Sequence, residues 1–265
     1  KTILPQDVKE KHTLWVIRIT IYNNYIFKLS RRVAQRSLPA ARLRICSLPK
    51  PIKDADMAHS KTLRIVLATQ NAGKVRELAD PLTEFGVEVL GLSSFPEIGD
   101  IEETGTTFEE NALIKARAVA ALTGLVSVAD DSGLEVDALD GAPGVYSARY
   151  SDDWESLPGE SRDARNIRKL LHAMTAVPAE KRGCRFVSCM AAAKPNGDEM
   201  VVRGTWEGTL LECPHGDNGF GYDPIFFDSS ARKSAAELTR DEKNARSHRG
   251  NALRALLARW TEFMH

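Results

Sequence analysis

Two neighbouring carboxylates, Asp130 and Asp131, follow the apolar run Leu125–Ala129 and precede Ser132 and Gly133. The run predicts a buried strand, and the carboxyl ends of such strands form the crevice in which α/β sheets bind ligands. Because adjacent strand residues point to opposite faces, we expect one aspartate to face the ligand. Magnesium prefers carboxylate oxygens and would link them to phosphate. A capped turn is the competing interpretation, and these residues alone leave both open.

A second segment with possible chemistry, Thr69–Lys74, lies between a predicted strand and a predicted helix. Backbone N–H groups at a helix N-terminus, together with a lysine, make a phosphate site. Gly73 would let the backbone approach closely, Lys74 would supply a point charge, and Asn71 would add a donor. The spacing is not that of the P-loop, so a standard NTPase is excluded. Taken alone, the segment is better explained as an ordinary surface turn.

Three further segments combine charged or aromatic side chains with helix starts or glycines. Glu102 and Glu103 precede a predicted helix, where they would complement its dipole or supply a second carboxylate to a metal. Residues 219–224, Gly-Phe-Gly-Tyr-Asp-Pro, form a platform on which a base could stack, or a structural turn with a buried aromatic pair. Residues 243–250 gather cations and hydrogen-bond donors, which by themselves would be a solvated basic face.

The hydrophobic pattern predicts the elements that would position these side chains. A Thr-x-x-Glu capping box at Thr107 and Glu110 begins one helix, and Gly124 ends it. Spacing and turn residues predict the other elements: strands at 63–68, 87–92, 125–129, 185–194 and 199–212, and helices at 75–85, 166–174 and 251–263. Strand–helix alternation followed by a hairpin predicts an α/β fold, with a mixed, elongated β-sheet flanked by helices and two lobes with the active-site cleft between them.

The charge of the chain is unevenly distributed, although its formal net charge is zero. Residues 1–56 carry twelve basic and four acidic side chains, which leaves 24 basic and 32 acidic ones from Met57 onward. An acidic body disfavours nucleic-acid binding and suits an enzyme whose anionic substrate arrives with a metal ion. We expect Met57 to be the natural start, residues 1–56 to be a basic extension that is not native or is disordered, and residues 57–265 to be the enzymatic domain. A targeting or nucleic-acid-binding arm is the alternative.

Cysteine usage and hydropathy indicate a protein of the cytoplasm. The four cysteines form no CxxC pair and have no histidine at zinc spacing, so we interpret them as free thiols in a reducing compartment. The most apolar stretch near the start, Leu14–Phe27, is broken by Arg18 and shorter than the roughly 20 residues that span a bilayer. We therefore expect no membrane association.

The order of the motifs is more distinctive than any one of them. The chain carries, in sequence, TxNxGK, EETGxTFxENA, ADDSGLxVDxLxGxPGxYSARY, FGYDPxFF and AELTxxEKNxxSHRGxAL. Over about Leu63–Trp260 it resembles the inosine triphosphate pyrophosphatase family, whose members remove deaminated purine nucleotides. These enzymes cleave the α–β phosphate bond of ITP, dITP and XTP with Mg²⁺, giving the monophosphate and pyrophosphate. Homodimers are typical of the family.

The resemblance also implies roles for individual residues. The catalytic pair would be Asp131, which orients or deprotonates the attacking water, and Lys74. Magnesium would be held by Glu103 and Asp131, and the sequence does not decide whether Glu102 joins them. The triphosphate would be held by Thr69, Gln70, Asn71, Ala72, Gly73 and Lys74, although some members have Gly at the position of Gln70. The base pocket would comprise Phe220, Gly221, Tyr222, Asp223, Lys243, His248 and Arg249, with Ser132 also contacting substrate.

Selection of deaminated purines requires donors aimed at the 6-oxo group, which adenine's amino group cannot satisfy. His248, Arg249 and nearby backbone N–H groups are the candidates. Guanine also carries a 6-oxo group, so rejection of GTP requires a disfavoured contact at its 2-amino group. Two rival functions stay open: a pyrophosphatase of similar fold for methylated or pyrimidine nucleotides, against which the SHRG and FGYD motifs argue, and a non-enzymatic nucleic-acid binder using the basic arm.

Overall fold

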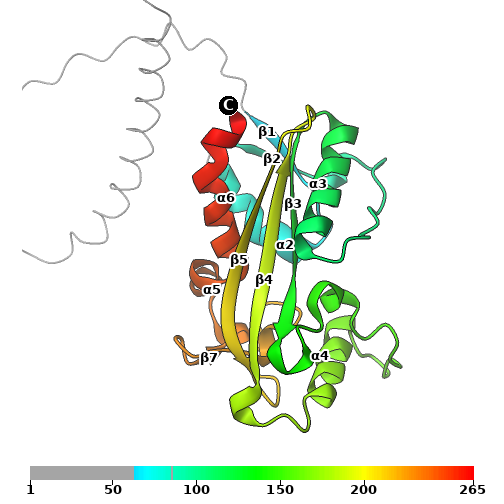
Figure 1. The fold of residues 1–265 in the computed structure, drawn as a ribbon, viewed down its shortest axis with the longest axis vertical. Helices are drawn as coiled ribbons and strands as arrows, with labels where there is room; N and C mark the ends of the chain where they lie inside the picture. The colour runs from blue at the N-terminus through cyan, green and yellow to red at the C-terminus, as the bar shows by residue number, and fades with distance from the viewer. Residues whose placement is uncertain (1–62, 85) are drawn as a thin grey trace, which may run out of the picture. The chain divides into compact units, whose positions relative to one another are not determined.

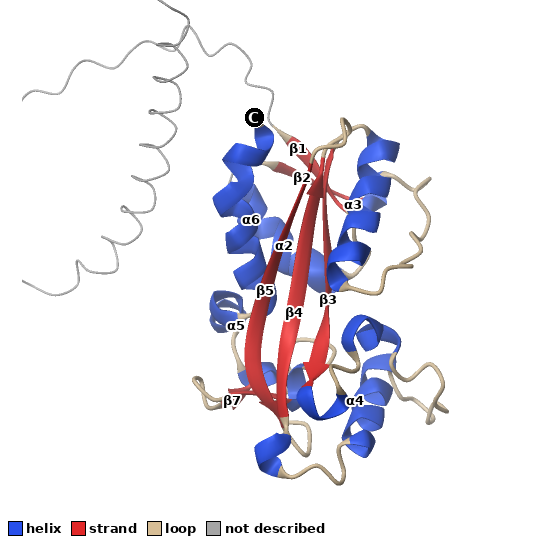
Figure 2. Cartoon of the chain, in the orientation of Figure 1, coloured by secondary structure: helices blue, strands red, loops and turns tan. Residues whose placement is uncertain are grey.

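The computed structural model describes residues 63–84 and 86–265, so the extension expected at residues 1–56 and the start expected at Met57 lie outside the described residues. The described chain folds around a seven-stranded sheet in the order β2-β1-β3-β4-β5-β6-β7, flanked by helices (Figure 2). The strands are β1 (Arg64–Leu67), β2 (Glu88–Gly91), β3 (Val126–Val136), β4 (Gly183–Ala193), β5 (Glu199–Leu210), β6 (Phe226–Asp228) and β7 (Lys233–Ser234). The helices are α2 (Ala72–Glu84), α3 (Phe108–Thr123), α4 (Arg162–Ala173), α5 (Arg240–Arg246) and α6 (His248–Met264).

The sheet is mixed, which confirms the predicted fold class. β1 pairs in parallel with β2 and β3, whereas β3, β4, β5, β6 and β7 pair antiparallel. The predicted hairpin is formed by β4 and β5, the longest pair of neighbouring strands. Because β3, β4 and β5 run far beyond the short β1, they form the elongated ribbon that joins the two ends of the fold (Figure 1).

Side chains of β1 alternate between two cores, one on each face of the sheet, as the two-residue period of a strand requires. Ile65 and Leu67 pack in a cluster with residues of α2 and α6. Val66 packs in a second cluster with residues of α3. Helices α2 and α6 therefore cover one face of the sheet, and α3 covers the other (Figure 1).

Helix α3 begins and ends where the sequence predicts. Thr107 is the N-cap, its side chain accepts from the N–H of Glu110, and the reciprocal bond from the Glu110 side chain completes the capping box. Gly124 follows the helix with φ of 66°, a left-handed conformation that glycine adopts at little cost. This fixed helix carries the side chain of Lys115 toward the sheet, where the candidate site lies.

Strand β3 corrects one prediction, because it does not end at Ala129 but continues to Val136. The antiparallel partner β4 pairs with it from Ser127 to Val136, and the carbonyl of Asp130 accepts from the side chains of Lys74 and Lys115. The parallel partner β1 stops earlier, at the pairing of Leu67 with Val128. Asp130 and Asp131 therefore lie in mid-strand, yet just beyond the end of the parallel part of the sheet.

The C-terminal region also differs from the prediction. The final helix α6 begins at His248 instead of residue 251, with Ser247 as its N-cap, and the separate helix α5 precedes it. Lys243 thus belongs to α5, while His248 and Arg249 occupy the first turn of α6. In the part of the chain that the structure describes, no helix is both long and apolar enough to cross a membrane.

A second lobe forms around the far ends of β3, β4 and β5, where α4 and the 3₁₀ segment Gly144–Arg149 pack (Figure 1). Its core includes Leu134, Leu170 and Phe226. Asn166 of α4 ties the lobe together, because its side chain accepts from Ser151 and donates to the carbonyls of residues 147 and 148. The candidate site lies where the two lobes meet.

Candidate active site

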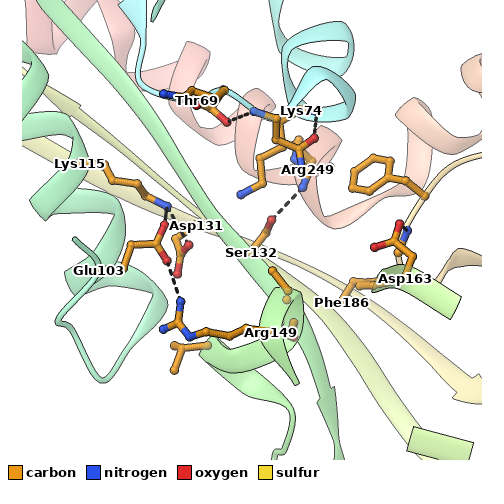
Figure 3. A pocket seen from close by; sticks show the side chains of 18 of the residues that line it. Thr69, Lys74, Glu103, Lys115, Asp131, Ser132, Arg149, Asp163, Phe186 and Arg249 are labelled. Atoms are coloured by element: carbon orange, nitrogen blue, oxygen red, sulfur yellow. Dashed lines mark hydrogen bonds and ion pairs between the residues drawn. The ribbon is translucent and has the colours of Figure 1, made fainter. Parts of the chain in front are cut away.

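A cavity of about 410 Å³ is lined by residues of both lobes. From the first lobe come the loop after β1, the segment before α3, and the middle of β3; from the second come the 3₁₀ segment and α4. The loop around Phe220 and the starts of α6 and α5 complete its walls. Figure 3 shows how side chains from these separate elements converge.

The structure brings most of the predicted site residues together in this cavity. Its lining includes Thr69, Gln70, Asn71, Lys74, Glu103, Asp131, Ser132, Phe220, Gly221, Tyr222, Asp223, Lys243, His248 and Arg249. Ala72 and Gly73 lie instead in the first turn of α2, directly behind the loop. The cavity thus gathers predicted side chains that are up to 180 residues apart in the sequence.

The start of α2 is organised by Asn71. Its side-chain oxygen accepts from the N–H groups of Gly73 at 2.9 Å and Lys74 at 3.1 Å, which are donors that a helix leaves unpaired in its first turn. Gly73 is also in contact with the base end of the cavity. A Cβ at that position would lie 2.8 Å from the ring of Phe220, so only glycine lets the start of α2 and the Phe220 loop pack this closely.

Asp130 is fully buried and anchors two cations. Its Oδ2 lies 2.9 Å from Lys74 Nζ and 3.3 Å from Arg249 Nε, and Ser188 donates to its Oδ1 at 2.5 Å. Burial alone would raise its pKa, but Lys74 and then Arg249 hold the pKa of Asp130 well below its usual value. Asp130 is therefore a permanent anion that fixes Lys74 at the mouth of the phosphate loop.

Asp131 points to the other face of β3, as the alternation of strand side chains requires. Lys115 Nζ lies 2.8 Å from Asp131 Oδ1 and 2.8 Å from Glu103 Oε1, bridging the two carboxylates (Figure 3). Burial raises the pKa of Asp131, against the opposing effect of Lys115. Asp131 Oδ2 is buried and has no hydrogen-bond partner among the described residues. Such an oxygen is available to a ligand.

The donors at this point fit a magnesium ion. Glu103 and Asp131 offer hard oxygen ligands, and the unpartnered Oδ2 of Asp131 has lone pairs free for coordination. Across residues 63–84 and 86–265 there is no group of three or more His, Cys, Asp or Glu side chains placed to hold a metal. Magnesium usually keeps several waters and binds through one or two carboxylates plus substrate phosphates, so two carboxylates are sufficient. Glu102 is exposed and does not line the cavity.

The base end of the cavity is built around Phe220 and its loop. Asp223 Oδ2 accepts from the N–H of Phe220 at 2.8 Å and from Lys243 Nζ at 2.6 Å, which holds the loop closed. Lys243 Nζ lies 4.9 Å from the centroid of the Phe220 ring. Tyr222 is buried and donates to the carbonyl of Ser147, so it contributes packing, whereas the half-buried Phe220 keeps ring surface for a base.

Arg249 and His248 form the inner wall of the base end. Arg249 pairs with Glu77 of α2 and donates from Nη2 to Ser132 Oγ at 2.8 Å. The His248 ring stacks on Phe186, with centroids 4.8 Å apart, and its buried Nδ1 has no hydrogen-bond partner within the described chain. Burial and the neighbouring Arg249 hold the pKa of His248 well below its usual value, so the imidazole is neutral.

Sequence reasoning missed four residues that line the cavity, Lys115, Arg149, Asp163 and Phe186. It also missed Glu77, which pairs with the lining residue Arg249. Lys115 left a visible signal, because it shares the apolar face of α3 with Ala112, Ala116 and Val119, where a lysine is out of place. Glu77 lies one turn after Lys74 on α2, but nothing in the pattern separates it from an ordinary solvent-facing carboxylate.

A mixed α/β sheet with a cavity of paired cations, carboxylates and aromatic rings is the architecture of a nucleotide-binding enzyme. Comparison with known proteins identifies the family within this class. The model described as the Ham1 family matches residues 65–259. The chain belongs to the Ham1 family, and the match confirms the family resemblance found in the motifs.

Similar proteins agree with this assignment. The chain is 64% identical, over 75% of its length and 96% of the relative, to the dITP/XTP pyrophosphatase of Nitratidesulfovibrio vulgaris. It is 50% identical, over 73% of its length and 92% of the relative, to a dITP/XTP pyrophosphatase of Bacillus cereus. The solved structure of a HAM1 protein from Coxiella burnetii is 44% identical, with a TM-score of 0.68 over 76% of this chain and 99% of that one.

Proposed function

We propose that this protein hydrolyses ITP, dITP and XTP to the nucleoside monophosphate and pyrophosphate with Mg²⁺, and so cleanses the nucleotide pool of deaminated purines. The observation that carries the proposal is the Asp131–Lys115–Glu103 cluster beside Lys74, in a chain 64% identical to a dITP/XTP pyrophosphatase. The same cavity supplies a phosphate loop and, in contact with Gly73 behind that loop, the aromatic ring of Phe220. The side chains that line the cavity therefore suit a substrate that has both a triphosphate and a base.

Asp131 is the proposed general base for the attacking water. A base works best when its pKa approaches the working pH, and burial raises the pKa of Asp131 from its usual value. Lys115 stabilises the ionised form and holds Oδ1, which leaves Oδ2 as the oxygen that faces a water or a ligand. The carboxylate is thus oriented by one cation and still has an oxygen to accept a proton.

Charge neutralisation is the second requirement, because phosphoryl transfer depends on positioning and electrostatics more than on covalent chemistry. Lys74, fixed by Asp130, would contact the phosphates together with the N–H groups at the start of α2. A Mg²⁺ ion held by Glu103 and Asp131 would polarise the phosphate oxygens. Ser132, whose hydroxyl is already oriented by Arg249, would contact the substrate between these groups.

Base selection is assigned to the inner wall of the cavity. Arg249 is held in place by Glu77 and Asp130, so its guanidinium presents fixed donors to a 6-oxo group. His248 is neutral and can offer an N–H to the same oxygen. Adenine carries an amino group at that position and would leave these buried donors unpaired, which costs affinity. Phe220 would stack on the base.

The experiment that tests the function measures pyrophosphate release from ITP, dITP and XTP against GTP and ATP, with and without Mg²⁺. We expect rapid release from the first three substrates only, and only with the metal. The Asp131→Asn variant should lose turnover while its melting temperature and circular dichroism stay near those of the wild type. Near-normal kinetics in that variant would refute the base assignment, and equal rates on all five nucleotides would refute the proposed substrate class.

Neighbouring glutamates provide a matched test of the metal ligands. Glu103 lines the cavity and contacts Lys115, whereas Glu102 is exposed outside it. We expect Glu103→Gln to raise the Mg²⁺ concentration needed for half-maximal activity by about tenfold or more, the scale on which changes around a metal site affect affinity. Glu102→Gln should leave it unchanged. Equal effects of both substitutions would remove Glu103 from the metal site.

Three remaining features of the proposal concern the whole protein. Residues 57–265 should suffice for activity, since the family match lies within them, and mass spectrometry of native protein would locate its N-terminus. The partner of the enzyme is a small nucleotide, neither nucleic acid nor membrane, and its working compartment is the cytoplasm. The active form is proposed to be a homodimer, as is typical of the inosine triphosphate pyrophosphatase family. Light scattering in solution would test this oligomeric state.

A further inference from the structure

Arg149 belongs to the YSARY motif, yet neither the phosphate loop, the carboxylate pair nor the base pocket accounts for it. Its side chain extends from the 3₁₀ segment Gly144–Arg149 and lines the cavity from the second lobe. The guanidinium lies over the ring of Tyr146, 5.3 Å from its centroid, and Nη1 lies 3.8 Å from Glu103 Oε2 (Figure 3). It therefore reaches across the cavity toward the first lobe.

Arg149 differs from the four other lysine and arginine side chains that line the cavity. Lys74, Lys115, Lys243 and Arg249 each have a carboxylate oxygen within hydrogen-bond distance, and their side chains are at most 15% exposed. The Arg149 side chain is 39% exposed, and its carboxylate partner lies beyond that distance. An exposed ion pair of this geometry is weak, so a stronger anion can displace Glu103 from the guanidinium at little cost.

The order of residues along the cavity indicates which part of a nucleotide Arg149 would meet. In Figure 3, Phe186 and Asp163 lie on one side of the cavity, and Asp131, Glu103 and the guanidinium of Arg149 lie together on the other. If the base stacks on Phe220 and the scissile α–β bond lies at Asp131, as proposed above, the β- and γ-phosphates would lie on the side of the cavity where Arg149 contacts Glu103. Those two phosphates leave together as pyrophosphate.

We propose that Arg149 is the binding residue for the terminal phosphates and for the pyrophosphate product, and that it exchanges its loose contact with Glu103 for these anions. This inference rests on the proposed function, because the orientation of the bound nucleotide is taken from it. A guanidinium presents a planar fork that matches two phosphate oxygens, which the ammonium of a lysine cannot do. When Glu103 turns to a divalent cation, Arg149 loses its only carboxylate partner within the described residues and is released toward phosphate.

The test measures binding of pyrophosphate to the full chain by titration calorimetry, with and without Mg²⁺, and needs no turnover. We expect Arg149→Ala to weaken pyrophosphate binding by roughly tenfold or more, the usual worth of a charge-assisted hydrogen-bonded pair, and Arg149→Lys to weaken it less. Binding of IMP, which lacks the terminal phosphates, should change by less than about twofold in both variants. Product inhibition by pyrophosphate should weaken in parallel.

Arg162 provides the matched control, since it is an exposed arginine of the same lobe in an equally loose pair, 3.9 Å from Asp152. Arg162→Ala should bind pyrophosphate like the wild type. Unchanged pyrophosphate binding in Arg149→Ala, or an equal loss for IMP, would overturn the proposal. If the wild type releases no pyrophosphate from ITP or XTP but binds it through Arg149, the proposed function fails and the anion site stands.

Discussion

Lys115 Nζ lies 2.8 Å from Asp131 Oδ1, and the pair is buried between α3 and β3. The same ammonium lies 2.8 Å from Glu103 and 3.1 Å from the backbone carbonyl of Asp130. Burial opposes its charge, but Asp131 and Glu103 raise the pKa of Lys115, so it stays protonated. One fixed positive charge thus orients the proposed base and a proposed metal ligand together.

Replacement of Lys115 by methionine should damage catalysis through the acid–base properties of Asp131. The Lys115→Met variant leaves a buried carboxylate without its largest compensating charge, so the pKa of Asp131 rises further. We expect kcat to fall by about a hundredfold or more, the scale of losing one preorganised electrostatic contact, and the acid limb of the pH–rate profile to move to higher pH. Kinetics across pH 5–9 measure both. A fall in kcat with an unmoved acid limb would contradict the link to Asp131.

Replacement of Lys74 by alanine separates substrate binding from catalysis. Lys74 lies at the phosphate loop and is fixed by Asp130, so it can contact phosphate charge in both the ground state and the transition state. We expect the variant to lose about a hundredfold in kcat/KM, with a fall in kcat as well as a rise in KM. An effect on KM alone would mean that Lys74 only holds the bound substrate. Melting temperatures should be measured with the kinetics, because Asp130 loses one cation and keeps Arg249 as a second one.

Much of the fold could be predicted because local sequence determines it. The capping box at Thr107, the glycine after α3 and the short apolar run of β1 are short-range signals, and the structure has the elements they predict. The long β3 could not be predicted from its own residues. The polar residues Asp130, Asp131 and Ser132 are typical of a strand end. The strand continues past them because they pair with β4.

The site shows the same division between local and long-range information. Lys74, Asp131 and Phe220 lie in distinctive motifs, and the cavity brings them together. The contacts of Lys115 with Glu103 and Asp131 depend on how α3 docks on the sheet, which no window of sequence contains. Glu77 is another case, because its contact with Arg249 joins residues 172 positions apart.

Replacement of Gly73 by alanine should separate stability from activity. Alanine favours a helix by about 0.5–1 kcal/mol over glycine, but the added Cβ would lie 2.8 Å from Phe220. We expect the ring to turn away from the base site, so that KM for ITP rises and kcat/KM falls by roughly tenfold, while the melting temperature changes little or increases. Gly91→Ala is the control, since its Cβ would meet only Ser93 Oγ at 3.5 Å. A large loss of stability in Gly73→Ala without a KM effect would contradict this account.

The buried His248 should make the stability of the protein depend on pH between about 5 and 7. Its pKa is lowered well below 6.5 in the folded state, mainly by burial and then by Arg249, while the unfolded chain takes up a proton near that value. The unfolded state then binds more protons, so the stability present above pH 6.5 is lost as the pH falls. The loss is about 1.4 kcal/mol per pH unit until the folded-state pKa is reached.

Urea unfolding of the wild type and of His248→Asn at several pH values measures this effect. Because the two proteins share every other ionisable group, the difference between their curves reports His248 alone. Glu160 does not contribute to the pH dependence between pH 5 and 7. Arg168 lowers the pKa of Glu160 to about 2, so the stability that this carboxylate contributes is present above pH 4.5 and is lost below it. We expect the wild type to lose stability from pH 7 to 5.5 more steeply than His248→Asn. Parallel curves would mean that the folded protein protonates His248, and its assignment as a neutral donor to the base would fall with that result.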